Sequence, residues 1–163
     1  MALQDYVIRA RELNDFNLKT YLGFPISESD KREFERGYNE LAEISRQHFN
    51  SRQFRTSKGN GNLWVVHPSC EEIDNGERPK QVQKLLDYVR RNRERHRTMI
   101  VSDAIDYIIN DHNFVESGLF DGVILTENNQ GKPLELSDLN PFKDAQQHLV
   151  GGCYVGMCLN VFV

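Results

Sequence analysis

The stretch 63–102, LWVVHPSCEEIDNGERPKQVQKLLDYVRRNRERHRTMIVS, decides the fold. Its two ends, LWVVH (63–67) and TMIVS (98–102), are short apolar runs, which are typical of buried strands. Between them Pro79 can open a helix whose apolar face consists of Val82, Leu85, Leu86 and Val89. A strand, a helix and a second strand in this order predict a βαβ unit with two parallel strands.

The same alternation continues to the end of the sequence. DGVILT (121–126) and HLVGGCY (148–154) predict two further strands. A short helix is expected over 104–110, and a longer one, capped by its first residue, over 137–147. We therefore expect an α/β domain over residues 63–163, with three layers around a mainly parallel sheet.

Residues 1–55 predict a helical N-terminal arm. Apolar residues recur at steps of three and four over 2–18, which indicates an amphipathic helix. A second helix is expected to start at Asp30, whose side chain can cap it while Glu33 reaches back. Its apolar face would consist of Phe34, Tyr38, Leu41, Ile44 and His48. The polar loop 51–62, which contains two glycines, separates the arm from the α/β domain.

The composition excludes several classes of function. A chain of 163 residues with 39% hydrophobic content can close a core. A net charge of −4 argues against a nucleic-acid partner, because it would repel a phosphate backbone. No apolar run approaches the roughly 20 residues that span a bilayer, and charges interrupt the segment where a signal peptide would be apolar. The odd count of three cysteines argues against a disulfide framework, so we expect a cytoplasmic protein without membrane contact.

Carboxylates gather in SDAIDYIIND (102–111). Asp103, Asp106 and Asp111 could aim two carboxylates at a divalent ion, as metal-dependent phosphoryl transfer requires. Helix capping and a solvated helix face explain the same residues equally well. No cysteine or histidine pair has the spacing of a zinc site. We therefore name no metal ligand and expect no cofactor.

The segment with most chemical information is HLVGGCYVGMCLN (148–160). A strand, a glycine pair and then Cys158 would put the thiol at the carboxyl end of a parallel strand, where open α/β sheets bind ligands. If a helix starts there, its free amides would lower the pKa of the thiol and make it nucleophilic. The alternative is that Gly156 marks a turn and 157–163 is a last buried strand, in which Cys158 is a small apolar side chain.

These residues resemble the nucleophile segment of the isochorismatase-like cysteine hydrolases, most closely over 149–160. In that family an apolar strand, a glycine and a short turn lead to the catalytic cysteine. The resemblance implies that Cys158 attacks the carbonyl of a small amide or ester substrate and forms a covalent thiol intermediate. It also implies a cis peptide bond between Tyr154 and Val155, with oxyanion donors near Val155 and Cys158.

The other catalytic residues of the family have less direct counterparts. The family aspartate ends the first strand, where this sequence has His67; Asp103, at the end of the second strand, could supply a carboxylate instead. The family lysine follows a central strand, and its nearest match is Lys132. His67 could itself serve as general base for a thiol brought from the fourth strand. The predicted catalytic set is therefore Cys158, Lys132, Asp103 and His67.

Two functions stay open at the level of the sequence. The first is a cysteine hydrolase acting on a small-molecule amide or ester. The turn GGCYVGMC (151–158) favours this function, which is the leading hypothesis. The alternative is a non-catalytic α/β interaction module that retains the hydrolase fold, and the imperfect carboxylate and lysine positions favour it. Only LNVFV follows Cys158, so whether the domain is complete at its carboxyl end is also open. In either case the N-terminal helices could cover a partner or a second subunit, which would make the protein a homo-oligomer.

Overall fold

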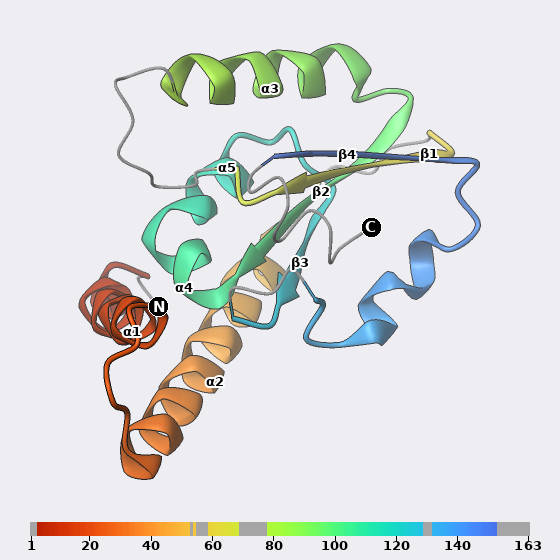
Figure 1. Cartoon of the computed structure of the whole chain (residues 1–163). Coiled ribbons are helices and arrows are strands. Elements are labelled where there is room, and N and C mark those ends of the chain that lie inside the picture. Colours follow the sequence, from red (N-terminus) through yellow and green to blue (C-terminus); the bar gives the residue numbers. More distant parts are fainter. Residues whose placement is uncertain (1–2, 53, 55–58, 69–77, 129–131, 153–163) are drawn as a thin grey trace.

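The structure, a computed structural model, describes residues 3–52, 54, 59–68, 78–128 and 132–152. Within these ranges the chain forms a parallel sheet of four strands in the order β3-β2-β1-β4, with helices packed around it (Figure 1). The strands are β1 (Gly61–Val66), β2 (His96–Asp103), β3 (Gly122–Thr126) and β4 (Gln147–Gly152). The predicted α/β class with a parallel sheet is confirmed.

The predicted βαβ unit lies at the centre of the sheet. β1 and β2 pair in parallel with Leu63 opposite Thr98, and α3 (Arg78–Asn92) lies between them in the chain. All six residues of β1 are buried, as expected for a central strand covered on both faces. On α3 the fully buried Val89 belongs to the same hydrophobic cluster as Leu63 and Ile100. Helix α3 therefore covers one face of the sheet.

Successive strand residues point to opposite faces of the sheet, and each face has its own hydrophobic cluster. The cluster shared with the helices contains Leu63, Val65, Ile100, Val123 and Leu125. The cluster on the other face contains Trp64, Val66, Met99, Val101 and Ile124, with Leu139 and Phe142 packed against it. The two clusters place β1 and β2 in the middle of the core.

The connection between β2 and β3 is a nearly continuous helical segment. It consists of α4 (Ala104–Asp106), the π-helical turn η2 (Tyr107–Asp111) and α5 (His112–Glu116). The sequence predicted a short helix over 104–110, so the helix is confirmed and extends further. Tyr107 and Ile108 are fully buried in the larger cluster, which anchors the segment to the sheet.

Two long helices form the N-terminal part of the chain. The 3₁₀ helix η1 (Leu3–Tyr6) leads into α1 (Val7–Tyr21), and α2 (Glu28–Asn50) follows. The predicted start of the second helix at Asp30 is wrong, because Ser27 is the cap. The Ser27 hydroxyl accepts from the Asp30 N–H at 3.1 Å, and the Asp30 carboxylate accepts from the Ser27 N–H at 3.3 Å. No helix within the described ranges is both long enough and apolar enough to cross a membrane.

The N-terminal helices share the hydrophobic core of the sheet. Tyr38, Leu41 and Ile44, three residues of the predicted apolar face, are buried in one cluster with Ile105 and Ile108. In Figure 1, α1 and α2 lie beside α4, whereas α3 lies at the other end of the molecule. The helical arm is therefore packed against the helical segment that leaves the carboxyl end of β2.

The segment between β3 and β4 differs from the prediction. The α-helix expected over 137–147 is wrong: a 3₁₀ helix, η3 (Leu136–Phe142), is present, and β4 begins at Gln147. Pro141 explains the difference, because a proline inside an α-helix removes one backbone donor and clashes with the preceding turn. Phe142 then packs edge-on against Trp64, with their ring centroids 5.1 Å apart, so the short helix still covers its face of the sheet.

Candidate functional site

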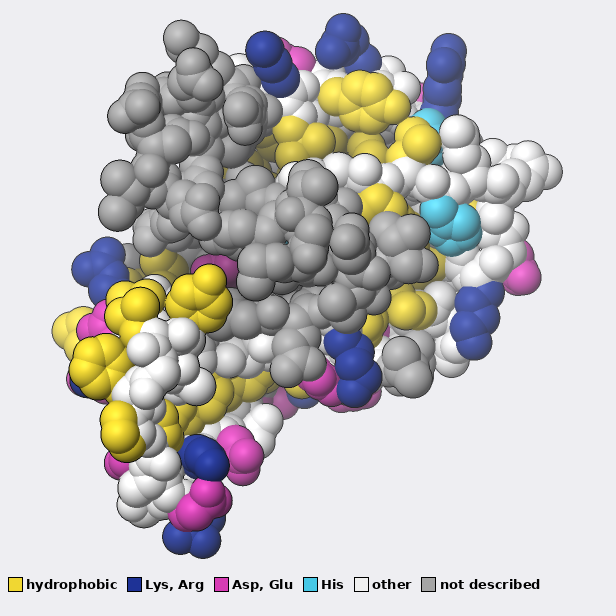
Figure 2. All heavy atoms as spheres, viewed as in Figure 1, with side chains coloured by type: hydrophobic (Ala, Val, Ile, Leu, Met, Phe, Trp, Pro, Cys, Tyr) yellow, Lys and Arg dark blue, Asp and Glu magenta, His cyan; other side chains and the backbone are white. Residues whose placement is uncertain are grey.

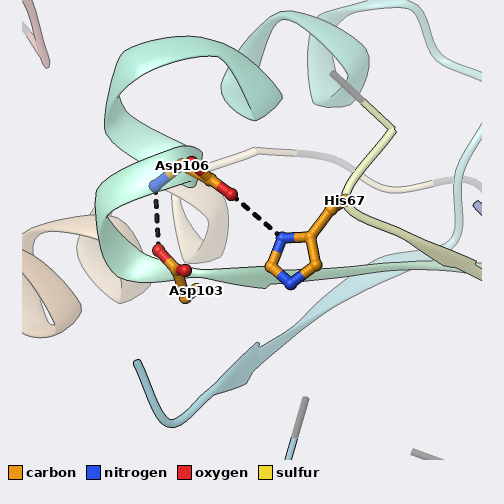
Figure 3. A group of neighbouring side chains, drawn as sticks. All are labelled: His67, Asp103 and Asp106. Carbon is orange, nitrogen blue, oxygen red and sulfur yellow. Dashed lines mark hydrogen bonds and ion pairs between the residues drawn. The ribbon is translucent and has the colours of Figure 1, made fainter. Parts of the chain in front are cut away.

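Side chains from three elements meet at the carboxyl edge of the sheet (Figure 3). His67 directly follows β1, Asp103 is the last residue of β2, and Asp106 lies in α4. One nitrogen or oxygen atom from each lies within 4.8 Å of the others. The order of the sheet reverses at β1, which has β2 on one side and β4 on the other. Open α/β sheets bind ligands beyond the strand ends at such a point.

His67 is held in an uncommon backbone conformation. Its φ is +44°, in the left-handed region that residues other than glycine rarely adopt, and its side chain is only 2% exposed. The His67 N–H donates to the Val101 carbonyl at 2.8 Å, which ties the turn to β2. Its Nδ1 lies 3.1 Å from Oδ2 of Asp106, and Figure 3 shows the ring directed toward that carboxylate. Strained residues of this kind persist where the surrounding packing holds them, and they cluster at functional sites.

Asp103 is the cap of α4. Its Oδ1 accepts from the backbone N–H groups of Ile105 and Asp106, each at 2.9 Å. Burial raises the pKa of Asp103 to about 7, the Asp106 carboxylate adds to this, and His67 opposes it. Asp103 therefore fixes the first turn of the helix that carries Asp106, and its own charge changes near neutral pH.

The arrangement fits a general base oriented by a carboxylate. A carboxylate close to Nδ1 of a histidine restricts the orientation of the ring and stabilises its charged form. With Nδ1 directed to Asp106, proton transfer with a nucleophile or substrate would go through Nε2 of His67. The chemistry that the contacts support is therefore acid–base catalysis at the end of β1.

The same three side chains are also of the types that hold divalent cations, since imidazole nitrogen and carboxylate oxygen are both metal ligands. A cation between them would compete for Oδ2 of Asp106 with His67, and for the Asp103 carboxylate with the start of α4. Asp111, the third residue of the metal hypothesis, accepts instead from the Ser102 hydroxyl at 2.6 Å. Asp111 is therefore engaged elsewhere, and the three side chains of the cluster fit both an acid–base pair and a cation site.

The chain was compared with protein-family models, with curated proteins and with solved structures. None of them matches it. The resemblance to isochorismatase-like hydrolases therefore stays a prediction, and the function has to be argued from the geometry of this site.

The predicted catalytic residues are only partly brought together. His67 and Asp103 lie in the same cluster. Lys132 follows β3, where its Nζ lies 2.6 Å from Oε1 of Glu127; among the described contacts it reaches neither His67 nor Asp103. Cys158 lies outside the described residues, as do Tyr154 and Val155. The structure therefore joins two of the four predicted residues.

Two residues near the site were not predicted to act there. Asp106 was considered only as a metal ligand. It follows Asp103, which ends β2 and caps α4, by three residues, and it therefore lies beside the strand ends. The Tyr38 hydroxyl, from α2, donates to the Thr126 carbonyl at 2.6 Å and accepts from the Ala104 N–H at 3.2 Å. Burial, followed by the negative charge of Asp103, raises the pKa of Tyr38 far above its ordinary value. Only the tertiary structure reveals this contact from the helical arm.

The dependence of stability on pH should report the ionisation of Asp103. Its pKa of about 7 in the folded chain exceeds the ordinary value of 3.8, so the folded state binds this proton more tightly than the unfolded state. The resulting stabilisation is complete below about pH 4 and is lost as the pH rises through about 7. Asp103→Asn keeps the capping acceptor but cannot ionise. Between about pH 5 and pH 8, its free energy of unfolding should therefore fall less than that of the wild type, by about 1–3 kcal/mol.

Urea unfolding at the two pH values measures this difference. Asp144→Asn is the matched control, since Asp144 is exposed and lies just before β4, at the edge of the sheet where the strands begin. Its free energy of unfolding should fall between the two pH values as much as that of the wild type. If Asp103→Asn also declined like the wild type, the buried carboxyl group of Asp103 would not titrate in this range.

Proposed function

We propose that the protein is a hydrolase of small amides or esters, with Cys158 as nucleophile and His67, oriented by Asp106, as general base. The observation that carries this proposal is the 3.1 Å contact between Nδ1 of His67 and Oδ2 of Asp106 at the carboxyl end of β1. A thiol is mostly protonated at neutral pH, and an adjacent imidazole held by a carboxylate is a general way to activate it.

The sequence position of the thiol supports the assignment. β1 and β4 pair in parallel, with Val66 opposite Gly152, so both strands end at the same edge of the sheet. His67 directly follows the first of these strands, and Cys158 follows the second by six residues. This order in the chain is the one that a base and a thiol acting on a common substrate would require.

The proposed reaction has two steps. Nε2 of His67 takes the proton of the thiol, and the sulfur bonds to the carbonyl carbon of the substrate. The leaving amine or alcohol departs with that proton, which leaves an acyl thioester. His67 then takes a proton from water, whose oxygen attacks the thioester, and the acid and the thiol are released. Asp106 stabilises the imidazolium formed in each step.

The other two predicted residues have supporting roles in this proposal. Asp103 is a positioning residue, because its carboxylate fixes the first turn of α4, which carries Asp106. Lys132 would be an electrostatic helper, and its Nζ is paired with Oε1 of Glu127 at 2.6 Å.

Alkylation by iodoacetamide, followed for each cysteine by peptide mass spectrometry, tests the proposal. Cys158 should react at about pH 7 at least tenfold faster than a model thiol, with an inflection well below about pH 8.5. Asp106→Asn preserves the size of the side chain but cannot stabilise the imidazolium, so it should slow the reaction about tenfold and move the inflection upward. Asp144→Asn, the same substitution at an exposed position, should change neither quantity.

Hydrolysis of p-nitrophenyl acetate by the wild type and by Cys158→Ala provides the second measurement, and the variant should lose the activity. If Cys158 reacts like a model thiol and Asp106→Asn has no effect on it, the hydrolase proposal fails. The non-catalytic interaction module would then be the better description of the chain.

A further inference from the structure

The outer face of α1 is unusually apolar. Five of the six large apolar side chains that are exposed within the described residues lie on α1 or on the turn after it: Ile8, Leu18, Tyr21, Leu22 and Phe24. Their exposed fractions run from 56% to 82%. Figure 2 shows hydrophobic side chains gathered over the end of the molecule where Figure 1 has α1. A contiguous exposed apolar patch marks an interaction surface more often than a solvated one.

Five exposed residues on one side of α1 and at its C-cap have heptad spacing. Ile8, Arg11, Asp15, Leu18 and Leu22 are spaced by three, four, three and four residues, and all five are exposed. This alternation, with a mean step of 3.5, is the seam along which two helices pack side by side. The opposite face of α1, with Ala10 and Leu13, is already buried in the core. Helix α1 therefore has one face for its own fold and a second that has no partner within the described residues. We call this second face the α1 seam.

We propose that the α1 seam packs antiparallel against the same seam of a second copy of this chain. When two α1 helices cross at the level of residue 13, residues equally distant from that point face each other. Ile8 of one copy then faces Leu18 of the other, and Arg11 faces Asp15. Twofold symmetry makes each of these contacts occur twice.

The charges select this arrangement. A parallel pair would oppose Arg11 to Arg11 and Asp15 to Asp15, and like charges at a helix seam exclude that pairing. In the antiparallel pair, two Arg11–Asp15 ion pairs take the place of both repulsions. They lie between the two contacts of Ile8 with Leu18. Within one chain, the neighbouring Arg9 pairs with Glu12 at 3.1 Å and with Glu33 at 3.3 Å, whereas Arg11 and Asp15 make no ion pair among the described residues. Both therefore remain available for a second copy.

The size of the seam predicts a weak dimer. A pair of 15-residue helices buries less than the roughly 1,200 Å² at the lower end of stable interfaces. We therefore expect a Kd of about 10–100 µM, which requires measurements at high protein concentration.

Sedimentation equilibrium of the full chain at about 5–300 µM, with a charge-exchange series, tests the proposal. The mean mass of the wild type should rise from monomer toward dimer over this range. Arg11→Glu alone and Asp15→Lys alone should each raise Kd at least tenfold, because each opposes like charges twice. The double variant exchanges the charges, so it should return Kd to within about threefold of the wild type. All positions are exposed, so each variant should keep the wild-type urea midpoint in dilute solution.

Arg32→Glu is the matched control, since it makes the same charge change at an exposed position of α2 outside the seam. It should leave Kd within about twofold. A wild type that stays monomeric throughout would overturn the proposal. Single variants without effect, or a double variant that fails to regain association, would likewise show that Arg11 and Asp15 do not face each other.

Discussion

Gly152→Ala should lower the free energy of unfolding by about 3 kcal/mol or more, whereas Gly151→Ala should change it by less than about 1 kcal/mol. Gly152 has a φ of +126°, which side chains rarely tolerate, and an added Cβ would overlap the carbonyl oxygen of Val66 on the paired strand. An added Cβ on Gly151 would lie 3.4 Å from Cδ1 of Leu85, an ordinary van der Waals contact. Alanine substitution should therefore destabilise the protein strongly at Gly152 and only slightly at the adjacent Gly151.

Urea unfolding of the two variants measures this contrast, and each is the control of the other. The physical reason is the close approach of β4 to β1 at the edge where both strands end, which only a residue without a side chain permits. Equal effects of the two substitutions would mean that the end of β4 does not pass this close to Val66.

Leu41→Ala should lower the free energy of unfolding by about 3–4 kcal/mol. Leu41 is fully buried on α2 in one cluster with Ile105 and Ile108, so its removal leaves a cavity between the N-terminal helices and α4. Because these elements share a core, the loss should appear in the whole molecule. Trp64 is the one tryptophan of the chain and lies on β1, in the cluster on the other face of the sheet. Its fluorescence therefore reports the sheet, while circular dichroism at 222 nm reports mainly the helices.

Both signals should shift together to a lower urea concentration. Leu18→Ala makes the same substitution at a side chain that is 56% exposed, and in dilute solution it should change stability by less than about 0.5 kcal/mol. A helical signal that shifts while the Trp64 transition stays in place would contradict a shared core.

The parts of the fold that were predicted correctly depend on local patterns. The apolar runs at 63–67 and 98–102 are too short for helices and flank a segment with helical period, so the βαβ unit is visible in the sequence. The second helix was also predicted, but its start was not, because Ser27 and Asp30 are both good caps. Only the structure shows that the two belong to one capping box, with Asp30 inside the helix.

The segment at 137–147 shows where a local pattern fails. Its first residue, Ser137, favours a helix start, but Pro141 stands where an α-helix needs a backbone donor. The packing of Phe142 on Trp64 then favours the tighter 3₁₀ turn. A proline four residues after the expected cap should have outweighed the capping signal.

The sequence predicted only those residues of the candidate site that lie at the ends of strands. His67 and Asp103 follow from their places at the ends of neighbouring parallel strands, because such ends meet at one edge. The contact between His67 and Asp106 depends on the left-handed turn after β1 and on the first turn of α4, and neither has a sequence pattern of its own. Tyr38 is remote in the sequence, so its approach to the Ala104 N–H is a property of the fold alone.

Through the hydroxyl of Tyr38, the N-terminal helices contribute directly to the candidate site, whereas the sequence predicted only a separate helical arm. This hydroxyl bridges the end of β3 and the start of α4, which carries Asp106, and thus braces the site. A fragment that starts after α2 would lose this brace and would leave Ile105 and Ile108 without their packing partners. The catalytic proposal should therefore be tested on the intact chain, since an inactive fragment would report the missing brace and not the chemistry.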